Sequence, residues 1–273
     1  MFERWLARWR LQADGQALHT PRSDLLPVRC VDGGAAMLKL ARDPQEAEAV
    51  SLLDWWDGDG AARVLRHEGV AVLLERACGP GSLWAMARDG DDDRATRLLC
   101  EVAARLHAPR AAALPALVPL TQWFAELAPA AQAHGGVLVD AEAMARRLLA
   151  QPREVVPLHG DLHHDNVLDF GSRGWLAIDP KGLLGERGFD YANLACNPDA
   201  GHPRAGIALA PGRLERLLAI VAQASGIEPV RLLQWILAWS GLSAAWCLHD
   251  PGDASEADIA LGVALRARQL LAG

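Results

Sequence analysis

Alternation of apolar and polar positions predicts two β-hairpins in the first third of the chain. The runs LLPVRCV (25–31) and AAMLKLA (35–41) flank Asp32-Gly33, a dipeptide that favours tight hairpin turns. The runs ARVLRHEG (62–69) and VAVLLERA (70–77) predict two further strands that turn at His67–Gly69. The N-terminal region should therefore contain a small antiparallel sheet.

Two stretches of the same region have helical spacing instead. Residues 1–13 predict a short amphipathic helix. Residues 44–56 predict a second helix, with Asp43 as its N-cap, Pro44 in its first turn and Glu46 completing a capping box. The sheet region is thus expected to have the order β-β-α-β-β, with one helix between its two hairpins.

Helical periodicity dominates after the Gly/Pro-rich connector CGPGSL (78–83). It predicts helices over 91–107, 117–132, 140–151, 212–224, 228–248 and 255–272, whereas the short apolar runs at 155–170 and 174–182 predict strand, loop and strand. We place the boundary near Cys78–Gly81 and expect two domains, residues 1–77 and 78–273, in an α+β fold.

Composition narrows the class of protein. Hydrophobic residues make up 51% of the 273 positions and charged residues 22%, which is typical of a packed globular chain. The net charge of −7 disfavours a nucleic-acid partner, which needs a basic surface, and is compatible with a cationic small molecule. No apolar run is long enough to span a membrane, and the N-terminus lacks the apolar core of a signal peptide.

The five cysteines are scattered and include no C-x-x-C pair, so neither a disulfide framework nor a structural zinc site is expected. This cysteine usage suits a reducing, cytoplasmic location. Composition does not distinguish a monomer from a homodimer.

The densest polar cluster of the chain is LHGDLHHDN, in which three histidines and two aspartates occupy positions 159–165. Phosphoryl transfer needs a carboxylate that orients a hydroxyl and oxygen ligands for Mg²⁺ on the nucleotide. Asp161 and Asn166 have the spacing D-x-x-x-x-N, and Asp179 follows one short strand later. Upstream, a strand lysine, Lys39, precedes a helix glutamate, Glu48, and the ordered set resembles that of the protein-kinase-like fold.

Further motifs sharpen this interpretation. LHGDLHHDNVL, AIDPKGLLGERGFDYANL, RLHAP, LLERACGPGSL and LSAAWCLHD together resemble the aminoglycoside/hydroxyurea phosphotransferases over nearly the whole chain. The resemblance implies a bilobal kinase-like fold, with a small antiparallel sheet and one helix before a larger helical lobe. It also implies ATP-dependent phosphorylation of a hydroxyl on a small, cationic acceptor, with streptomycin or a related aminocyclitol as the first expectation.

The same resemblance implies roles for individual residues. Asp161 would be the catalytic base, and Asn166 and Asp179 would hold Mg²⁺. Lys39 would contact the α- and β-phosphates and pair with Glu48. The backbone of a hinge over residues 74–77, which includes Glu75 and Ala77, would bind adenine. A glycine-rich phosphate loop is missing at LHTPRSDLLPV, and Ser23 is the candidate for its role.

Acceptor-binding carboxylates are harder to assign. Asp190, Asp199 and Asp250 are candidates for binding a cationic acceptor. The sequence favours the alternatives, a structural anchor for Asp190 and solvated loop caps for the other two. Lys181 is either a surface lysine or a neighbour of the phosphates.

The histidines of the cluster leave other functions open. His159 is expected to brace the loop by hydrogen bonds, and His163, His164 and Asp165 to pack within it. One alternative is a dinuclear metal phosphoesterase built on residues 159–165, since two-metal sites use such ligands. Another is a nucleotide-binding module without turnover, against which the complete set of candidate catalytic residues argues.

Overall fold

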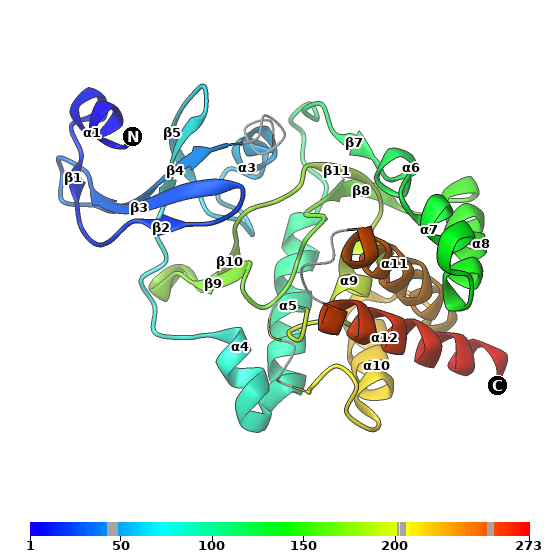
Figure 1. Ribbon diagram of the computed structural model, residues 1–273. Helices are drawn as coiled ribbons and strands as arrows, with labels where there is room; N and C mark the ends of the chain where they lie inside the picture. The colour runs from blue at the N-terminus through cyan, green and yellow to red at the C-terminus, as the bar shows by residue number, and fades with distance from the viewer. Residues whose placement is uncertain (43–48, 201, 203–205, 250–253) are drawn as a thin grey trace.

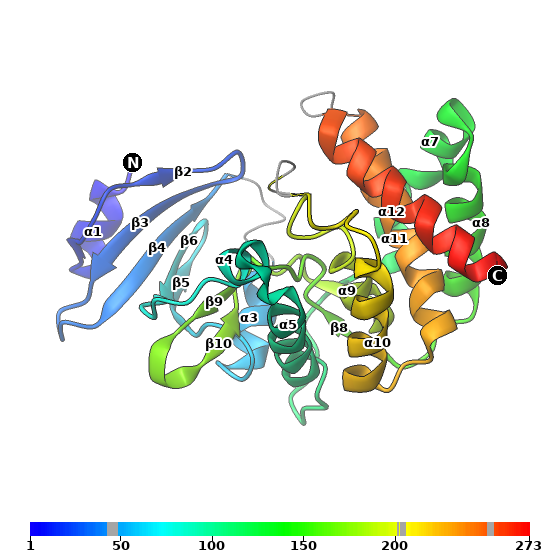
Figure 2. The same ribbon diagram turned by 90° about the horizontal axis from the view of Figure 1, so that it is seen from below.

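The structure is a computed structural model that describes residues 1–42, 49–200, 202, 206–249 and 254–273. It has a small lobe built on an antiparallel sheet and a larger, mainly helical lobe (Figures 1 and 2). This is the bilobal α+β arrangement that the sequence predicted. The chain passes between the lobes after residue 75 and before residue 83, so the division at 77/78 stays a prediction.

The sheet of the small lobe has the order β1-β3-β4-β6-β5, with β2 paired to β3. Its strands are β1 Gln12–Ala13, β2 Leu18–His19, β3 Ser23–Arg29, β4 Ala35–Ala41, β5 Val64–Glu68 and β6 Ala71–Glu75. Both hairpins are confirmed, and Gly33 takes the left-handed conformation (φ 83°) that the first turn requires. The second turn lies at residues 69–70 rather than at His67–Gly69, because His67 and Glu68 pair with Val72 and Ala71. Among the described residues of this lobe, the helices are α1 Glu3–Trp9 and α3 Val50–Trp56.

Alternation along β4 determines which side chains face which side of the sheet. Leu38 and Leu40 are buried against Trp5 and Trp9 of α1, which covers the outer face. The side chain of Lys39 points the other way and is 13% exposed. The lysine therefore lies on the face directed towards the large lobe, as the sequence pattern predicted.

The helices of the large lobe pack around one continuous apolar core. They are α4 Leu83–Met86, the π-helical turn η1 Ala87–Asp91, α5 Asp92–Leu106, α6 Leu120–Trp123, α7 Leu127–His134, α8 Val137–Ala150, α9 Gly188–Asn193, α10 Arg213–Ser225, α11 Pro229–His249 and α12 Ala254–Ala272. Among the described residues, no helix combines the length and the apolar character needed to cross a membrane.

Short strands of the large lobe carry the polar loops. They are β7 Val118–Pro119, β8 Val155–Leu158, β9 Val167–Asp169, β10 Trp175–Ala177 and β11 Leu183–Glu186, with the 3₁₀ turn η2 Gly171–Arg173 between β9 and β10. Strands β9 and β10 form a hairpin, and β11 pairs with both β7 and β8. The hairpin lies between the sheet of the small lobe and helix α5 (Figure 2).

Three predicted helices need correction or restriction. The first helix ends at Trp9 rather than at residue 13, because Gln12–Ala13 pairs with β3. The helix predicted over 117–132 is wrong as one element, since Val118–Pro119 pairs with β11 and two separate helices, α6 and α7, follow. Of the helix predicted over 44–56, Val50–Trp56 is confirmed, and residues 43–48 lie outside the described part.

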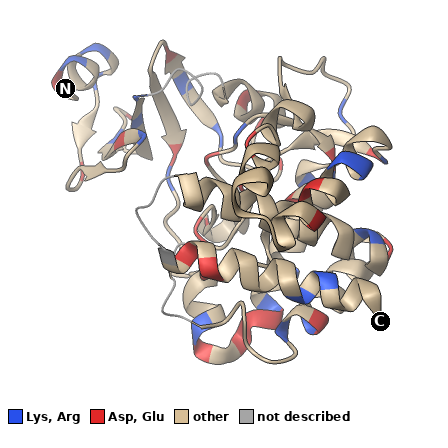
Figure 3. Cartoon of the chain, turned by 45° about the vertical axis from the view of Figure 1, so that its right-hand side comes forward, with Lys and Arg blue, Asp and Glu red and all other residues tan. Residues whose placement is uncertain are grey.

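The cartoon of Figure 3 colours the positions of basic and acidic residues, and both kinds occur along the described elements of each lobe.

Candidate active site

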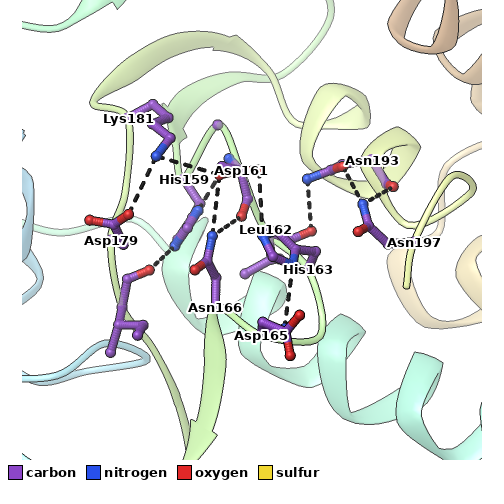
Figure 4. Close-up of polar contacts among 12 residues, drawn as sticks. His159, Asp161, Leu162, His163, Asp165, Asn166, Asp179, Lys181, Asn193 and Asn197 are labelled. Carbon is purple, nitrogen blue, oxygen red and sulfur yellow. Dashed lines mark hydrogen bonds and ion pairs between the residues drawn. The ribbon is translucent and has the colours of Figure 1, made fainter. Parts of the chain in front are cut away.

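The loop between β8 and β9 carries Asp161 and Asn166 (Figure 4). It begins with a sharp bend at Gly160, which has φ 85°, and a Cβ there would lie 2.8 Å from the side chain of Leu183. Only glycine fits that backbone and that space. The Asn166 amide donates to the Asp161 carbonyl oxygen at 2.8 Å and weakly to its carboxylate at 3.3 Å. The loop thus closes on itself and holds the two side chains together.

His159 holds this loop in place through two hydrogen bonds of its ring. Its Nε2 donates to the carbonyl oxygen of Ile178 at 2.8 Å, while its Nδ1 accepts from the backbone N–H of Asp161 at 3.2 Å. The ring is fully buried beside the Trp56 indole, and burial lowers its pKa. A neutral imidazole with these two bonds ties the aspartate loop to the strand that precedes Asp179.

Asp179 follows β10 and brings the two lobes together. It has φ 60°, a left-handed conformation that is uncommon outside glycine and concentrates at functional sites. Its carboxylate forms an ion pair with Lys39, which comes from β4 of the small lobe. Burial alone would raise the pKa of Asp179, but the charges of Lys39 and Lys181 outweigh it and hold the pKa at about 2. The predicted convergence of Lys39 and Asp179 is therefore present in the structure.

Lys181 lies between the two carboxylates of the site. Its Nζ is 3.4 Å from Oδ2 of Asp179 and 3.4 Å from Oδ2 of Asp161 (Figure 4). Burial would raise the pKa of Asp161, but the electrostatic interactions with His163 and Lys181 outweigh it and lower the pKa below its usual range. Both carboxylates are therefore ionised at neutral pH.

Asp190 lies behind the loop rather than beside it. The side chain is fully buried, and its oxygens accept bonds from the backbone N–H groups of His159 (2.9 Å) and Gly160 (2.8 Å) and from Nε2 of His107 (2.9 Å). Full burial and these three bonds agree with a structural anchor, the alternative that the sequence favoured over a contact with the acceptor.

Of the two other predicted acceptor carboxylates, only Asp199 is among the described residues. Asp199 is 1% exposed, and its Oδ2 accepts from the backbone N–H groups of Ile207 and Ala208. Asp199 thus caps the backbone of this loop, as the cap alternative predicted, although its position is buried rather than solvated. Asp250 and Glu48, the predicted partner of Lys39, lie outside the described residues.

The predicted nucleotide contacts lie along the inner face of the sheet. Ser23 closes the turn between β2 and β3, where Thr20 exchanges two hydrogen bonds with its backbone, and its side chain is buried. The turn, rather than the serine side chain, is the exposed part of this segment. Glu75 ends β6, and its carboxylate is bound by Arg173 of the β9–β10 turn, while its backbone N–H donates to the carbonyl oxygen of Arg63 at 2.9 Å. Adenine binding by the hinge backbone stays a prediction.

Apolar side chains that the sequence reasoning missed surround the hinge. Ala77 packs with Leu168 and Ile178 against the buried residues Ala62, Phe170 and Leu176. In the small lobe, Pro27 of β3 and Met37 of β4 are half-buried on the same face of the sheet as Lys39. Leu168 lies two residues after Asn166, and Ile178 lies immediately before Asp179. Their closeness in sequence to these polar residues could have identified them as neighbours of the site.

The remaining histidines of the cluster have separate surroundings. His163 Nδ1 accepts from the backbone N–H of Asp165, and its Nε2 is 3.7 Å from the Asp161 carboxylate. His164 is buried, which lowers its pKa to about 3. Asp165 is bound by His202 at 2.9 Å, and the His202 ring lies against Trp84.

These separate surroundings bear on the phosphoesterase alternative. Within the described ranges, no three His, Cys, Asp or Glu side chains come together as a metal site. A dinuclear centre on residues 159–165 therefore finds no support.

Comparison with known protein families decides the assignment. The family model described as aminoglycoside/hydroxyurea antibiotic resistance kinase matches residues 8–251. The chain belongs to this family. It is therefore a small-molecule kinase, a phosphotransferase that acts on an alcohol group, as the motifs predicted.

Individual members of the family extend over the whole chain. A streptomycin 3''-kinase of Klebsiella pneumoniae is 56% identical over 267 residues, which cover 97% of this chain and all of that protein. A streptomycin 6-kinase of Streptomyces glaucescens is 31% identical and covers 97% of this chain and 88% of its own length.

Solved structures confirm the fold. Aminoglycoside phosphotransferase APH(4)-Ia superposes with a TM-score of 0.67 at 15% identity, over 97% of both chains. An ethanolamine kinase of Plasmodium vivax gives a TM-score of 0.65 at 12% identity, over 94% of this chain and 82% of that one. At such low identity these likenesses concern the fold alone.

Proposed function

We propose that this protein transfers the γ-phosphoryl group of ATP to the 3''-hydroxyl of streptomycin. The observation that carries the proposal is the 56% identity to a streptomycin 3''-kinase over the full length of that protein. The streptomycin 6-kinase covers a similar share of the chain at 31% identity, so the 3'' position is the better supported acceptor site. ATP as donor is supported by a kinase-like structure, a mutant of aminoglycoside phosphotransferase APH(4)-Ia in a ternary complex with ADP and hygromycin B.

Asp161 is the proposed base. It is ionised, partly exposed, and held by Asn166 and by the His159 brace at a fixed position in the loop. A carboxylate of low pKa removes a proton late in phosphoryl transfer, when the attacking hydroxyl has become acidic, and before that it orients the hydroxyl. Positioning and charge stabilisation thus supply most of the rate enhancement.

Asn166 and Asp179 are the proposed ligands of Mg²⁺. The Asn166 amide nitrogen is bonded to Asp161, so its oxygen faces the side on which Asp179 lies (Figure 4). One ionised carboxylate and one amide oxygen form the hard donor set that Mg²⁺ takes together with nucleotide phosphates and water. Bound there, the ion would neutralise phosphate charge, and both ligands are present to hold it.

The nucleotide is proposed to lie under the sheet. Adenine would bind the hinge backbone at Glu75–Ala77 between Met37 above and Leu168 below, and the triphosphate would run from there to Lys39. The turn at residues 20–22 is proposed to cover the phosphates in place of a glycine-rich loop.

The proposal is tested by the product. Purified protein with ATP, Mg²⁺ and streptomycin should release ADP, and two-dimensional phosphorus–proton NMR should place the new phosphate on the 3'' carbon. Hydroxyurea and a hygromycin serve as comparison acceptors. A phosphate at carbon 6, or turnover only with another acceptor, would contradict the proposed regiochemistry or substrate.

Replacing Lys39 by Met should weaken the use of ATP more than it slows the chemical step. We expect KM for ATP to rise by about tenfold or more, because the ammonium binds phosphate in the ground state as well as in the transition state. Steady-state kinetics at varied ATP concentration measures the effect. An unchanged KM for ATP would show that Lys39 serves only to pair with Asp179.

A further inference from the structure

Lysine is rare in this chain, and both lysines contact the same carboxylate. Of 27 basic side chains, only Lys39 and Lys181 are lysines, and every other one is arginine. Lys39 pairs with Oδ1 of Asp179, and Lys181 lies 3.4 Å from its Oδ2. An ammonium is a compact point charge, whereas a guanidinium is a broad planar fork. A chain that otherwise uses arginine keeps the smaller cation at the two positions that border Asp179.

The position of Lys181 is built into the backbone. Its N–H donates to the carbonyl oxygen of His159 at 2.6 Å, which ties it to the start of the catalytic loop. The side chain then passes over Gly160, where an added Cβ would lie 3.0 Å from the lysine Cβ. Lys181 is therefore fixed against the residue that immediately precedes Asp161, and its side chain is only 19% exposed.

The two lysines lie on different sides of the proposed metal ligand. Lys39 approaches Asp179 from the small lobe, on the side of the nucleotide. Lys181 approaches from the large lobe and lies within 3.4 Å of both Asp179 and Asp161. A phosphoryl group that moves from the nucleotide to a hydroxyl at Asp161 must pass beside this ammonium.

We propose that Lys181 is a catalytic residue that binds the phosphoryl group while it is transferred. This inference deepens the proposed function and rests on it. In the transition state the phosphorus is only loosely bonded to the attacking and leaving oxygens, and negative charge is spread over the three equatorial oxygens of the phosphoryl group. A fixed cation beside these oxygens stabilises that state. Lys39 then holds the rest of the triphosphate.

The step balances without Lys181 giving up a proton. The acceptor oxygen forms a bond to the γ-phosphorus, and the bond from phosphorus to the β,γ-bridging oxygen breaks with its electron pair leaving on ADP. The proton of the acceptor hydroxyl passes to the Asp161 carboxylate. Lys181 contributes only its charge and position, which separates its role from that of the base.

The test compares Lys181→Met with Lys181→Arg. We expect the methionine variant to lose about 100-fold or more in kcat, with KM for ATP within about threefold of the wild-type value, the reverse of the pattern expected for Lys39→Met. The arginine variant restores the charge but not the size, and its kcat should stay about tenfold or more below wild type. Arg146→Met, which removes a cation from the outer surface of α8, is the matched control.

The outcomes are distinct. A Lys181→Met enzyme with kcat within about fivefold of wild type would overturn the inference and leave Lys181 as a neutralising neighbour of two carboxylates. Thermal unfolding and ATP binding by calorimetry identify a variant that has merely lost its fold. If Lys181→Met has done so, a second neutral variant, Lys181→Gln, decides: full activity in it would also overturn the inference. A wild-type protein that phosphorylates no streptomycin refutes the proposed function instead, and with it this deeper assignment.

Discussion

Replacing Asp161 by Asn should lower kcat by about 100-fold to 10,000-fold while ATP binding stays nearly intact. The amide cannot accept the hydroxyl proton, and it orients the hydroxyl without the negative charge. The loop should keep its shape, because Asn166 donates mainly to the backbone carbonyl of residue 161 at 2.8 Å. Phosphate binding loses no cation, so the nucleotide should still bind.

The measurement is ADP release in a coupled assay, with ATP affinity determined separately by calorimetry. Asp140→Asn, which neutralises an exposed carboxylate on α8, is the control and should retain wild-type turnover. Turnover close to wild type in the Asp161 variant would refute its assignment as the base. A combined loss of ATP binding and turnover would instead indicate that the loop had collapsed.

The elements that could be predicted from sequence are those whose own pattern determines them. Strand β4 alternates Leu38, Lys39 and Leu40, and burial of the leucines against α1 leaves the lysine only one side to face. Strand β7 has two residues, Val118–Pro119, and exists because β11 lies beside it. A segment defined by its partner carries no periodicity of its own, so a helix was predicted there.

The same distinction applies to the site. Lys39, Asp161, Asn166 and Asp179 were identified by their order and spacing, and the structure brings them together. Asp190 and Asp199 could not be distinguished from acceptor ligands in the same way. What distinguishes them is burial and the backbone N–H groups that they accept, both of which depend on distant segments.

The scarcity of lysine in the sequence could have been used to predict that both lysines belong to the site. Composition shows how rarely this chain uses lysine, and that rarity gives weight to each occurrence. From spacing alone, Lys181 could be either a surface lysine or a neighbour of the phosphates. Contacts of 3.4 Å to both carboxylates favour the second.

Replacing Asp190 by Asn should destabilise the protein as well as slow it. The carboxylate accepts bonds from two backbone N–H groups and from His107 in a fully buried position, and an amide would turn an NH₂ group towards these donors. Leaving buried donors unpaired should cost about 2–4 kcal/mol in the free energy of unfolding. For a chain of this size, Tm should fall by roughly 5–15 °C.

This substitution also separates the two interpretations of Asp190. An anchor behind the loop predicts a lower Tm together with a lower kcat, since the backbone that positions Asp161 is released, while KM for the acceptor changes little. A direct acceptor contact predicts the opposite, a higher KM for streptomycin at an unchanged Tm. Thermal unfolding and acceptor kinetics on the same preparation, with Asp140→Asn as the surface control, decide between them. The distances of 2.8 and 2.9 Å from Asp190 to the backbone of the loop lead us to expect the first result.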